Sequence, residues 1–312
     1  MKHLADLLLT SMVKQDPGIL PLAARYAATE NSVAGSLNMM TGWRTVTGVR
    51  TVGQYVVDLT RRTVFVTAAL DEGGSSTMFW ARITTDTDDR IAELEMYKAA
   101  SRHQGGFVMH ADELGKFPAG WTSAIPADGR ATRDELELLA RAIYDNTLPA
   151  PEASEDCLLM ELGGVVYEDP DYMDLLMIGE IQPHESDEPV TMVAGLGDFR
   201  PTDPHARVLA VDEEQGIAVV TAAIPGFVSP YVVRKTTESC FVPAPMIEMH
   251  RRSLDTGWID ERKALIEMPA MCMSTQVVRL HSGKLQGLQL FNALTGPGAT
   301  SPWPIDRDAN AR

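Results

Sequence analysis

The chain has few of the residues and runs that mark several common protein classes. Its 312 residues include three cysteines, whose odd number and spacing fit neither a disulfide framework nor a metal site. We therefore expect a reducing compartment, the cytoplasm. No stretch reaches the apolar length of a membrane span. Asp6 interrupts the apolar N-terminal stretch, which favours an amphipathic helix over a signal peptide.

Basic residues are also scarce. Lys and Arg total 27 against 43 Asp and Glu, the formal net charge is −16, and no basic run occurs. Nucleic acids and anionic membranes are bound largely through Lys and Arg, so both kinds of partner are disfavoured. The sequence lacks H-x-H, H-E-x-x-H, a nucleotide-binding glycine fingerprint and a G-x-S-x-G elbow. We therefore expect no metal, no cofactor and no hydride, phosphoryl or serine-hydrolase chemistry.

What the sequence does contain is an internal repeat. YVVDLTRRTVFVTAAL at 55–70 matches LAVDEEQGIAVVTAAI at 209–224, and both have an apolar run, a polar break and a β-branched run. This pattern is typical of a β-hairpin. Asp58 and Asp212 precede the two turns, where a short carboxylate can bind backbone N–H groups. Two further pairs match in the same chain order: 28–35 with 159–166, and 90–96 with 284–290.

The order of patterns predicts two similar halves. In the first, helices are expected over 2–14 and 20–28, followed by strands at 53–58, 62–71, 76–86 and 90–98. In the second, a helix is expected over 132–146, with Thr132 as N-cap and Glu135 as its capping-box partner. Its apolar stripe is Leu136, Leu139, Ala140 and Ile143. We place a first domain at 1–103, a linker at 104–131, a second domain at 132–303 and a tail at 304–312.

These residues resemble a known superfamily. DCLLMELGG (156–164), HARVLAVDEEQG (205–216), VVRLHSGKLQGL (277–288) and TGPGATSPW (295–303) are similar to runs of a domain of unknown function found in fungal and bacterial SnoaL-like proteins. The chain thus resembles the nuclear-transport-factor-2-like superfamily, in tandem. Three polar positions of the family pattern differ: Leu159 and Leu162 replace an Arg and an Asn, and of two paired arginines only Arg207 is kept.

The resemblance implies a fold and an activity. The implied fold class is α+β, with two cone-shaped (cystatin-like) domains, each a curved antiparallel sheet wrapped around helices. The implied activity is that of a cofactor-independent lyase or isomerase, by dehydration, isomerisation or retro-aldol cleavage. Its substrate would be a small, hydrophobic, aromatic or polyketide-like molecule. Convex sheet faces commonly mediate pairing in this superfamily, so a homo-oligomer, with a dimer favoured, is also expected.

Such reactions require a base and a donor that stabilises an oxyanion. Glu30 and Glu161 stand where the first strand of each half enters the fold, so each is a candidate base; the alternative is a carboxylate bonded to backbone or to an Arg. His250 is a further candidate base or a surface residue. Tyr144 and Arg207 are candidate oxyanion donors, with the core and solvent as their alternatives.

The other candidates have more ordinary interpretations. Arg279 is a possible ion-pair partner. Tyr26 and Tyr55 are expected in the core, and Glu93 and Glu95 on the convex sheet face, in solvated or interface roles. The alternative function for the whole chain is a non-catalytic module that binds small molecules or assembles with partners. This alternative is favoured because the chain lacks several polar residues of the family pattern.

Overall fold

The structure, a computed structural model, describes residues 1–100, 109–117, 120–145, 152–165, 205–233, 236–244 and 268–304, with Leu148, Asp203 and Ile247. The first half contains α1 (Lys2–Val13), β1 (Leu22–Glu30), β2 (Val33–Ala34), α2 (Thr41–Thr45), β3 (Val46–Asp58), β4 (Thr63–Glu72), β5 (Ser75–Thr85) and β6 (Ile91–Ala100). The second half contains α3 (Arg133–Ala142), β7 (Ala153–Glu161), β8 (Gly164–Val165), β9 (Arg207–Asp212), β10 (Ile217–Val233), β11 (Thr236–Pro243), β12 (Met268–His281) and β13 (Lys284–Thr295).

The strands form two sheets with the same order. The first sheet has six strands in the order β2-β1-β6-β5-β4-β3. The second has seven, in the order β8-β7-β13-β12-β10-β11, and β9 also pairs with β10. Both sheets are mixed, because β1 runs parallel to β6 and β7 runs parallel to β13. Each strand of the first sheet therefore has a counterpart in the second, and β11 is an addition.

The repeat extends to the register of the strands. Pairing of β1 with β6 jumps from Leu22–Ile91 to Ala27–Glu93. Pairing of β7 with β13 makes the same jump, from Ala153–Leu285 to Leu158–Gly287. The same register shift at equivalent positions indicates that the two halves are copies of one fold. The predicted internal repeat is thus matched by strand order and by register.

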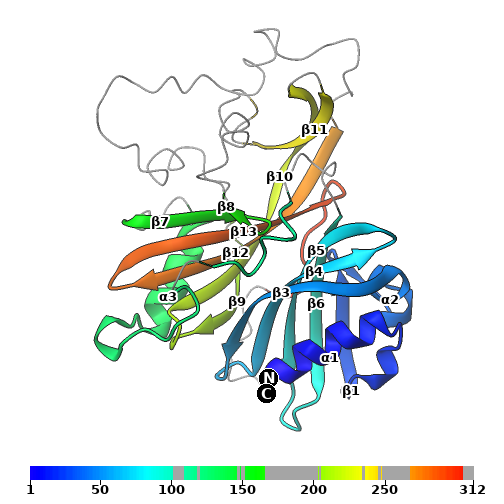
Figure 1. The fold of residues 1–312 in the computed structure, drawn as a ribbon, viewed down its shortest axis with the longest axis horizontal. Coiled ribbons are helices and arrows are strands. Elements are labelled where there is room, and N and C mark those ends of the chain that lie inside the picture. The colour runs from blue at the N-terminus through cyan, green and yellow to red at the C-terminus, as the bar shows by residue number, and fades with distance from the viewer. Residues whose placement is uncertain are drawn as a thin grey trace.

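The two sheets pack against each other through their inner faces, and one helix covers part of each outer face (Figure 1). Successive side chains of a strand point to opposite faces. In β4, Phe65 and Ala69 join the core between the sheets, while Val64 and Val66 join the core under α1. A third core lies between α3 and the second sheet. The inner faces of the two sheets are therefore occupied within one chain.

The contact between the sheets relates equivalent positions. Trp80 on β5 and Thr275 on β12 are counterparts, and the indole Nε1 of Trp80 donates a hydrogen bond to the Thr275 hydroxyl at 3.0 Å. A residue that meets its own counterpart lies near a pseudo-two-fold axis. The halves thus pack as two similar subunits of a symmetric dimer would.

The expected fold class is wrong. Strands dominate the structure, and the described residues form three α-helices, of which α2 has only five residues. The two sheets are mixed rather than antiparallel, and they lie against each other instead of each wrapping around its own helices. The halves are therefore not two helix-wrapped cones.

One predicted helix contributes to this error. Residues 20–28, rich in alanine, were expected to be helical, but β1 covers Leu22–Glu30. Its last residues pair with β6, which supplies tertiary hydrogen bonds that override a weak helix propensity. Tyr26, expected in the core, is 39% exposed. The predicted helix at 2–14 and the four strands of the first half are confirmed within a few residues, except that β3 begins earlier, at Val46.

Local signals in both halves are confirmed. The Thr132 side chain accepts from the backbone of Glu135, and the Glu135 side chain accepts from the backbone of Thr132, so the capping box is present. Asp58 Oδ1 accepts from the backbone N–H of Arg61, and Asp212 Oδ1 from that of Gln215, as expected for the two turns. No helix in the described part of the chain is long and apolar enough to cross a membrane.

Candidate functional site

Glu30 lies at the end of β1, where it serves a neighbouring helix. Its Oε1 accepts hydrogen bonds from the backbone N–H and the hydroxyl of Thr41, at 2.9 and 2.5 Å, and its Oε2 accepts from the N–H of Gly42 at 2.8 Å. Thr41 and Gly42 are the first residues of α2, whose N–H groups have no partner inside the helix. Both carboxylate oxygens thus bind the start of α2. Glu30 therefore has the structural role that was the alternative to catalysis, a carboxylate bonded to backbone.

Glu161 occupies the same position in the second half. Glu30 pairs with Met96 and Val33, and Glu161 pairs with Leu290 and Gly164. The Glu161 side chain is buried, at 4% exposure, and its Oε1 accepts from Nδ2 of Asn292 at 3.1 Å. The carboxylate therefore lies on the sheet itself, beside a neutral amide.

Tyr144 directly follows the last turn of α3 and is fully buried. Its hydroxyl donates to the hydroxyl of Ser274 on β12 at 2.6 Å. Burial raises the pKa of the phenol, although hydrogen bonds to Ser274 and Gln276 oppose this. Tyr144 is therefore neutral near pH 7 and retains its proton as a hydrogen-bond donor.

Together these side chains form a polar row on the outer face of the second sheet. The row runs from Glu161 on β7 to Asn292 on β13, Ser274 on β12 and Tyr144 beyond α3. Asn292 and Ser274 are directly paired across the two strands. The structure thus brings together Glu161 and Tyr144, two of the five residues predicted to act in catalysis.

A thiol lies beside this polar row. Burial raises the pKa of the Cys272 thiol, and the charge of the nearby Glu161 carboxylate raises it further. Cys272 is 2% exposed and lies in the same core as α3. It is therefore a protonated apolar wall of the site rather than a nucleophile.

The same face of the first sheet is closed. Met96 and Ala81, the counterparts of Leu290 and Gln276, are 0% and 1% exposed and belong to the core that contains α1. Leu290 and Gln276 are paired in the second sheet and are both partly exposed. The sheet surface beside Glu161, formed by Gln276 and Leu290 and here called the floor, is therefore accessible. The equivalent surface beside Glu30 is filled by side chains.

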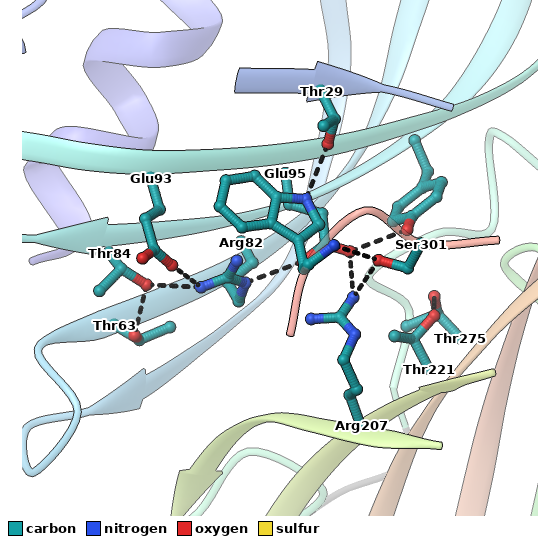
Figure 2. A network of polar contacts seen from close by, with 12 residues as sticks. Thr29, Thr63, Arg82, Thr84, Glu93, Glu95, Arg207, Thr221, Thr275 and Ser301 are labelled. Atoms are coloured by element: carbon teal, nitrogen blue, oxygen red, sulfur yellow. Dashed lines mark hydrogen bonds and ion pairs between the residues drawn. The ribbon is translucent and has the colours of Figure 1, made fainter. Parts of the chain in front are cut away.

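Arg207, the fourth predicted residue that the structure describes, lies on the opposite face of the second sheet. It extends from β9 toward Glu95 and Ser301 (Figure 2). Its Nη2 donates to Glu95 Oε1 and, at 2.9 Å, to the Ser301 hydroxyl. Arg207 therefore belongs to a buried network between the sheets and does not face Glu161.

Glu95 is the centre of this network. It is 0% exposed, and besides Arg207 it accepts from Arg82 Nε at 2.9 Å and from the Tyr97 hydroxyl at 2.8 Å. Burial alone would raise its pKa, but the charges of Arg207 and Arg82 outweigh burial and hold the pKa of Glu95 below its ordinary value. Glu95 is therefore ionised near pH 7, and both of its oxygens accept hydrogen bonds from neighbouring side chains.

The C-terminal segment Ser301–Trp303 covers this network. The Trp303 indole lies over the Arg82 guanidinium, 4.8 Å from ring centroid to Cζ, and its Nε1 donates to the Thr29 hydroxyl at 3.0 Å. Trp303 is 7% exposed. The segment follows β13 of the second sheet and ends on β1 of the first, so it ties the two sheets together.

Sequence reasoning did not single out this network. It placed Glu93 and Glu95 on one sheet face in a solvated or interface role. Glu95 joins the two sheets through Arg207, whereas Glu93 pairs with Arg82 of its own sheet. Arg279, a possible partner of a catalytic carboxylate, instead donates to the carbonyl oxygens of Gly120 and Ser123. His250 lies outside the described residues and stays a prediction. No group of His, Cys, Asp and Glu in the described ranges is arranged to hold a metal ion.

Comparisons with known proteins add little. No family model matches the chain, and no curated protein matches it. Among solved structures, the chain is similar to a de novo designed protein with a curved β-sheet, at 13% identity and a TM-score of 0.27, over 31% of this chain and 84% of the designed one. A TM-score this low supports no argument about fold or function. Membership of the SnoaL-like superfamily therefore stays a prediction.

Proposed function

We propose that the second half of the chain binds a small, hydrophobic molecule on the outer face of its sheet. There it acts as a cofactor-independent lyase or isomerase. The observation that carries this proposal is the accessible floor at Gln276 and Leu290, next to the buried Glu161. Small-molecule sites are lined mainly by apolar side chains, with a few convergent polar groups that orient the ligand.

In the proposed reaction, Glu161 is the base. Its carboxylate takes a proton from a carbon next to a carbonyl, and the electron pair of the C–H bond moves onto the carbonyl oxygen to give an enolate. Amide and hydroxyl donors of Gln276 and Ser274 stabilise that oxyanion, and the neutral Tyr144 phenol supports Ser274.

The enolate then has two main outcomes. If the substrate has a C=C bond next to that carbon, the enolate is a dienolate, and return of the proton from Glu161 to its far carbon moves the double bond and gives an isomer. If the enolate electron pair forms a C=C bond and expels a β-hydroxyl, the protonated Glu161 supplies the proton with which it leaves as water. In the retro-aldol variant, Glu161 instead removes the proton of a β-hydroxyl, the bond between the α- and β-carbons breaks to give an aldehyde and an enolate, and the protonated Glu161 returns the proton to the α-carbon. In each case the carboxylate is regenerated, so no cofactor is consumed.

Proton exchange tests the proposal without knowledge of the natural substrate. The full chain in D2O is mixed with 2-tetralone, and loss of the α-proton signal is followed by ¹H NMR. We expect exchange above the buffer rate, reduced about 100-fold or more in Glu161→Gln. Glu30→Gln is the matched control, because it changes the same position of the first half and leaves the second untouched. Equal exchange in the wild type and Glu161→Gln would refute the role of Glu161.

A second candidate function is a non-catalytic module that binds small molecules or assembles with partners. It is favoured by the use of Glu30 to hold α2 and of Glu95 to join the sheets, since both carboxylates have structural roles. Saturable binding of 2-tetralone without any exchange would support this alternative. Self-association also stays a prediction, and a dimer would have to use a surface other than the inner sheet faces.

We infer the reducing cytoplasm as the compartment. Cys157 and Cys272 are free thiols. This is the state expected where glutathione and thioredoxin keep cysteines reduced. Mass spectrometry of the protein, alkylated immediately on cell lysis, tests this: we expect the peptides of Cys157 and Cys272 to carry the alkyl group.

A further inference from the structure

We infer that the segment between the two halves positions Glu161. Residues 110–115, here called the linker turn, hold the hairpin turn that follows Glu161 and connect that hairpin to β3 of the first half. They act through Glu161, so they are positioning residues and not catalytic ones. Their effect on proton transfer rests on the proposed function, whereas their hold on the hairpin does not.

The hairpin turn after Glu161 has an unusual backbone. Glu161 ends β7, and Leu162 and Gly163 connect it to β8 with φ angles of 42° and 95°. Of the seven non-glycine residues in the described ranges that have a left-handed backbone, Leu162 alone has an apolar side chain. This conformation is unfavourable for leucine, because its Cβ lies too close to the following carbonyl oxygen. Contacts from outside the turn must therefore hold it.

The equivalent turn of the first half is held by its own side chain. Asn31 and Ser32 occupy the positions of Leu162 and Gly163, and asparagine adopts a left-handed backbone more readily than leucine does. The Asn31 amide also pairs with the backbone of Lys98: its Nδ2 donates to the carbonyl oxygen at 3.1 Å, and its Oδ1 accepts from the N–H at 2.8 Å. A leucine side chain can make neither hydrogen bond, so the turn of the second half needs another support.

The linker turn supplies this support. The N–H of His110 donates to the carbonyl oxygen of Leu162 at 3.0 Å. The carbonyl oxygen of His110 accepts from the N–H groups of Glu113 and Leu114, which closes the linker turn itself. The Leu162 side chain is fully buried in the core between the sheets, which it shares with Leu114. Burial and the hydrogen bond from His110 thus offset the cost of the left-handed backbone.

Two glycines make this close approach possible. A Cβ added to Gly164 would lie 2.1 Å from Cδ2 and 2.4 Å from Cγ of the His110 ring. A Cβ added to Gly163 would lie 2.6 Å from the His110 carbonyl oxygen and 3.2 Å from Cβ of Leu114. In the first half the position of Gly164 is taken by Val33, which is 70% exposed. The second hairpin is therefore shaped to receive the linker turn, because any side chain at position 164 would collide with His110.

The linker turn also reaches the first half. A Cβ added to Gly53 on β3 would lie 2.8 Å from Cγ of Leu114. Leu114 thus lies between one glycine of each sheet, Gly53 on one side and Gly163 on the other. Such a chain of packed groups can carry coupling between two elements. A shift of β3 would therefore move the hairpin turn, and with it Glu161.

Amide hydrogen/deuterium exchange of the full chain, followed by mass spectrometry, tests the hold on the hairpin. Gly164→Ala adds a Cβ where the backbone is not left-handed, so its main effect is to displace His110. We expect the peptides that contain His110 and Leu162 to exchange about tenfold or more faster, because their hydrogen bonds open. Val33→Ala changes the equivalent position of the first half and is the matched control. It should leave both hairpins unchanged, because Val33 is exposed.

A second substitution should restore the hairpin. The three atoms nearest to the added Cβ all belong to the His110 ring, so the double variant His110→Ala with Gly164→Ala has room for it. We expect its amide exchange at Leu162 to return to within about threefold of the wild type. Leu114→Ala is an independent variant that keeps both glycines and removes the contact with Gly163, and it should also speed exchange at Leu162. Unchanged exchange in Gly164→Ala or in Leu114→Ala, or no recovery in the double variant, would overturn the inference.

The proton exchange assay with 2-tetralone tests the link to Glu161. Gly164→Ala should lower kcat about tenfold and leave KM unchanged, because the carboxylate is displaced while the floor is intact, and the double variant should recover kcat. An active wild type with equal kcat in Gly164→Ala would overturn the positioning role. Absence of proton exchange in the wild type would instead refute the proposed function, and the amide exchange results would still support or overturn the hold on the hairpin.

Discussion

Glu95 on β6 and Gln289 on β13 occupy the same position in the two sheets, and each bonds to the edge strand of the opposite sheet. Glu95 accepts from Arg207 on β9, while Gln289 donates to Oε1 of Gln54 on β3 at 3.0 Å. Trp121 donates to the same oxygen at 3.1 Å. One side of the pseudo-symmetric interface is therefore ionic and the other side is neutral.

The ionic side should respond strongly to loss of its carboxylate. Glu95→Gln leaves Arg82 and Arg207 without their shared counter-charge in a buried place, and breaking a buried ion pair in this way costs about 3–5 kcal/mol. Urea denaturation of the full chain measures the change in the free energy of unfolding. Lys116→Met, which breaks the exposed pair with Glu113, is the control and should cost less than about 1 kcal/mol. Similar losses in the two variants would contradict a special role for Glu95.

Acid should weaken the protein through the same carboxylate. The pKa of Glu95 lies below the ordinary value of 4.5 in the folded chain, as does that of Glu72, where hydrogen bonds from Lys98, Thr45 and Thr77 overcome the effect of burial. A group with a lowered pKa in the folded state stabilises it fully above the unfolded pKa, and this stabilisation is lost as the pH falls through the folded value.

The contribution of these two carboxylates to the free energy of unfolding should therefore change little between pH 7 and about 5.5. At pH values below 4.5 it should decrease. Urea midpoints measured from pH 7 to pH 3 test this expectation. In Glu95→Gln the fall should be shallower than in the wild type, because one of the responsible groups is gone. An unchanged slope in that variant would show that other carboxylates dominate acid unfolding.

Trp303 should contribute to the stability of both halves, since it reaches from the second sheet to the first. Trp303→Ala removes a buried ring, a contact with Arg82 and a hydrogen bond to Thr29, for a loss of about 3 kcal/mol. Trp303→Phe keeps a ring over Arg82 and removes only the N–H donor, so about 1 kcal/mol is expected. Chemical denaturation measures both. Equal losses would mean that the hydrogen bond, and not the ring, holds the segment.

The thiols should differ in reactivity. Burial raises the pKa of Cys157 to about 11, and that of the more deeply buried Cys272 still further. At pH 8 both thiols are protonated, and only Cys157 is partly exposed. Alkylation by iodoacetamide, mapped by peptide mass spectrometry, should therefore modify Cys157 slowly and Cys272 only after unfolding. Rapid modification of Cys272 in the native protein would show that the core under α3 opens.

Local features of the fold were accessible from the sequence because short-range physics determines them. The alternation of β-branched residues around Asp58 and Asp212 predicted both hairpins, and the Thr132–Glu135 capping box predicted the start of α3. The strand at Leu22–Glu30 was missed, because its pairing with β6 depends on a partner more than sixty positions away. Alanine-rich segments give no local sign of such a partner.

The site was accessible only in part for the same reason. The repeat identified Glu30 and Glu161 as equivalent, but their neighbours decide their roles: Thr41 and Gly42 surround one, and Asn292 lies beside the other. Arg207 was predicted to face a ligand, yet its partner Glu95 lies on the other sheet. Which face of a strand meets a second sheet is a tertiary property, and the period of two in the sequence gives only the alternation.

The meeting of Trp80 with its counterpart Thr275 has a consequence for how the protein can change. In an assembly of two identical chains, every substitution appears on both sides of the axis. A carboxylate at position 95 would then be present on both sides, and neither side could have a glutamine in its place. Joining the two copies in one polypeptide removes that constraint. One half can fill the outer face of its sheet with side chains while the other half leaves that face partly exposed. Neither change has to occur in both halves.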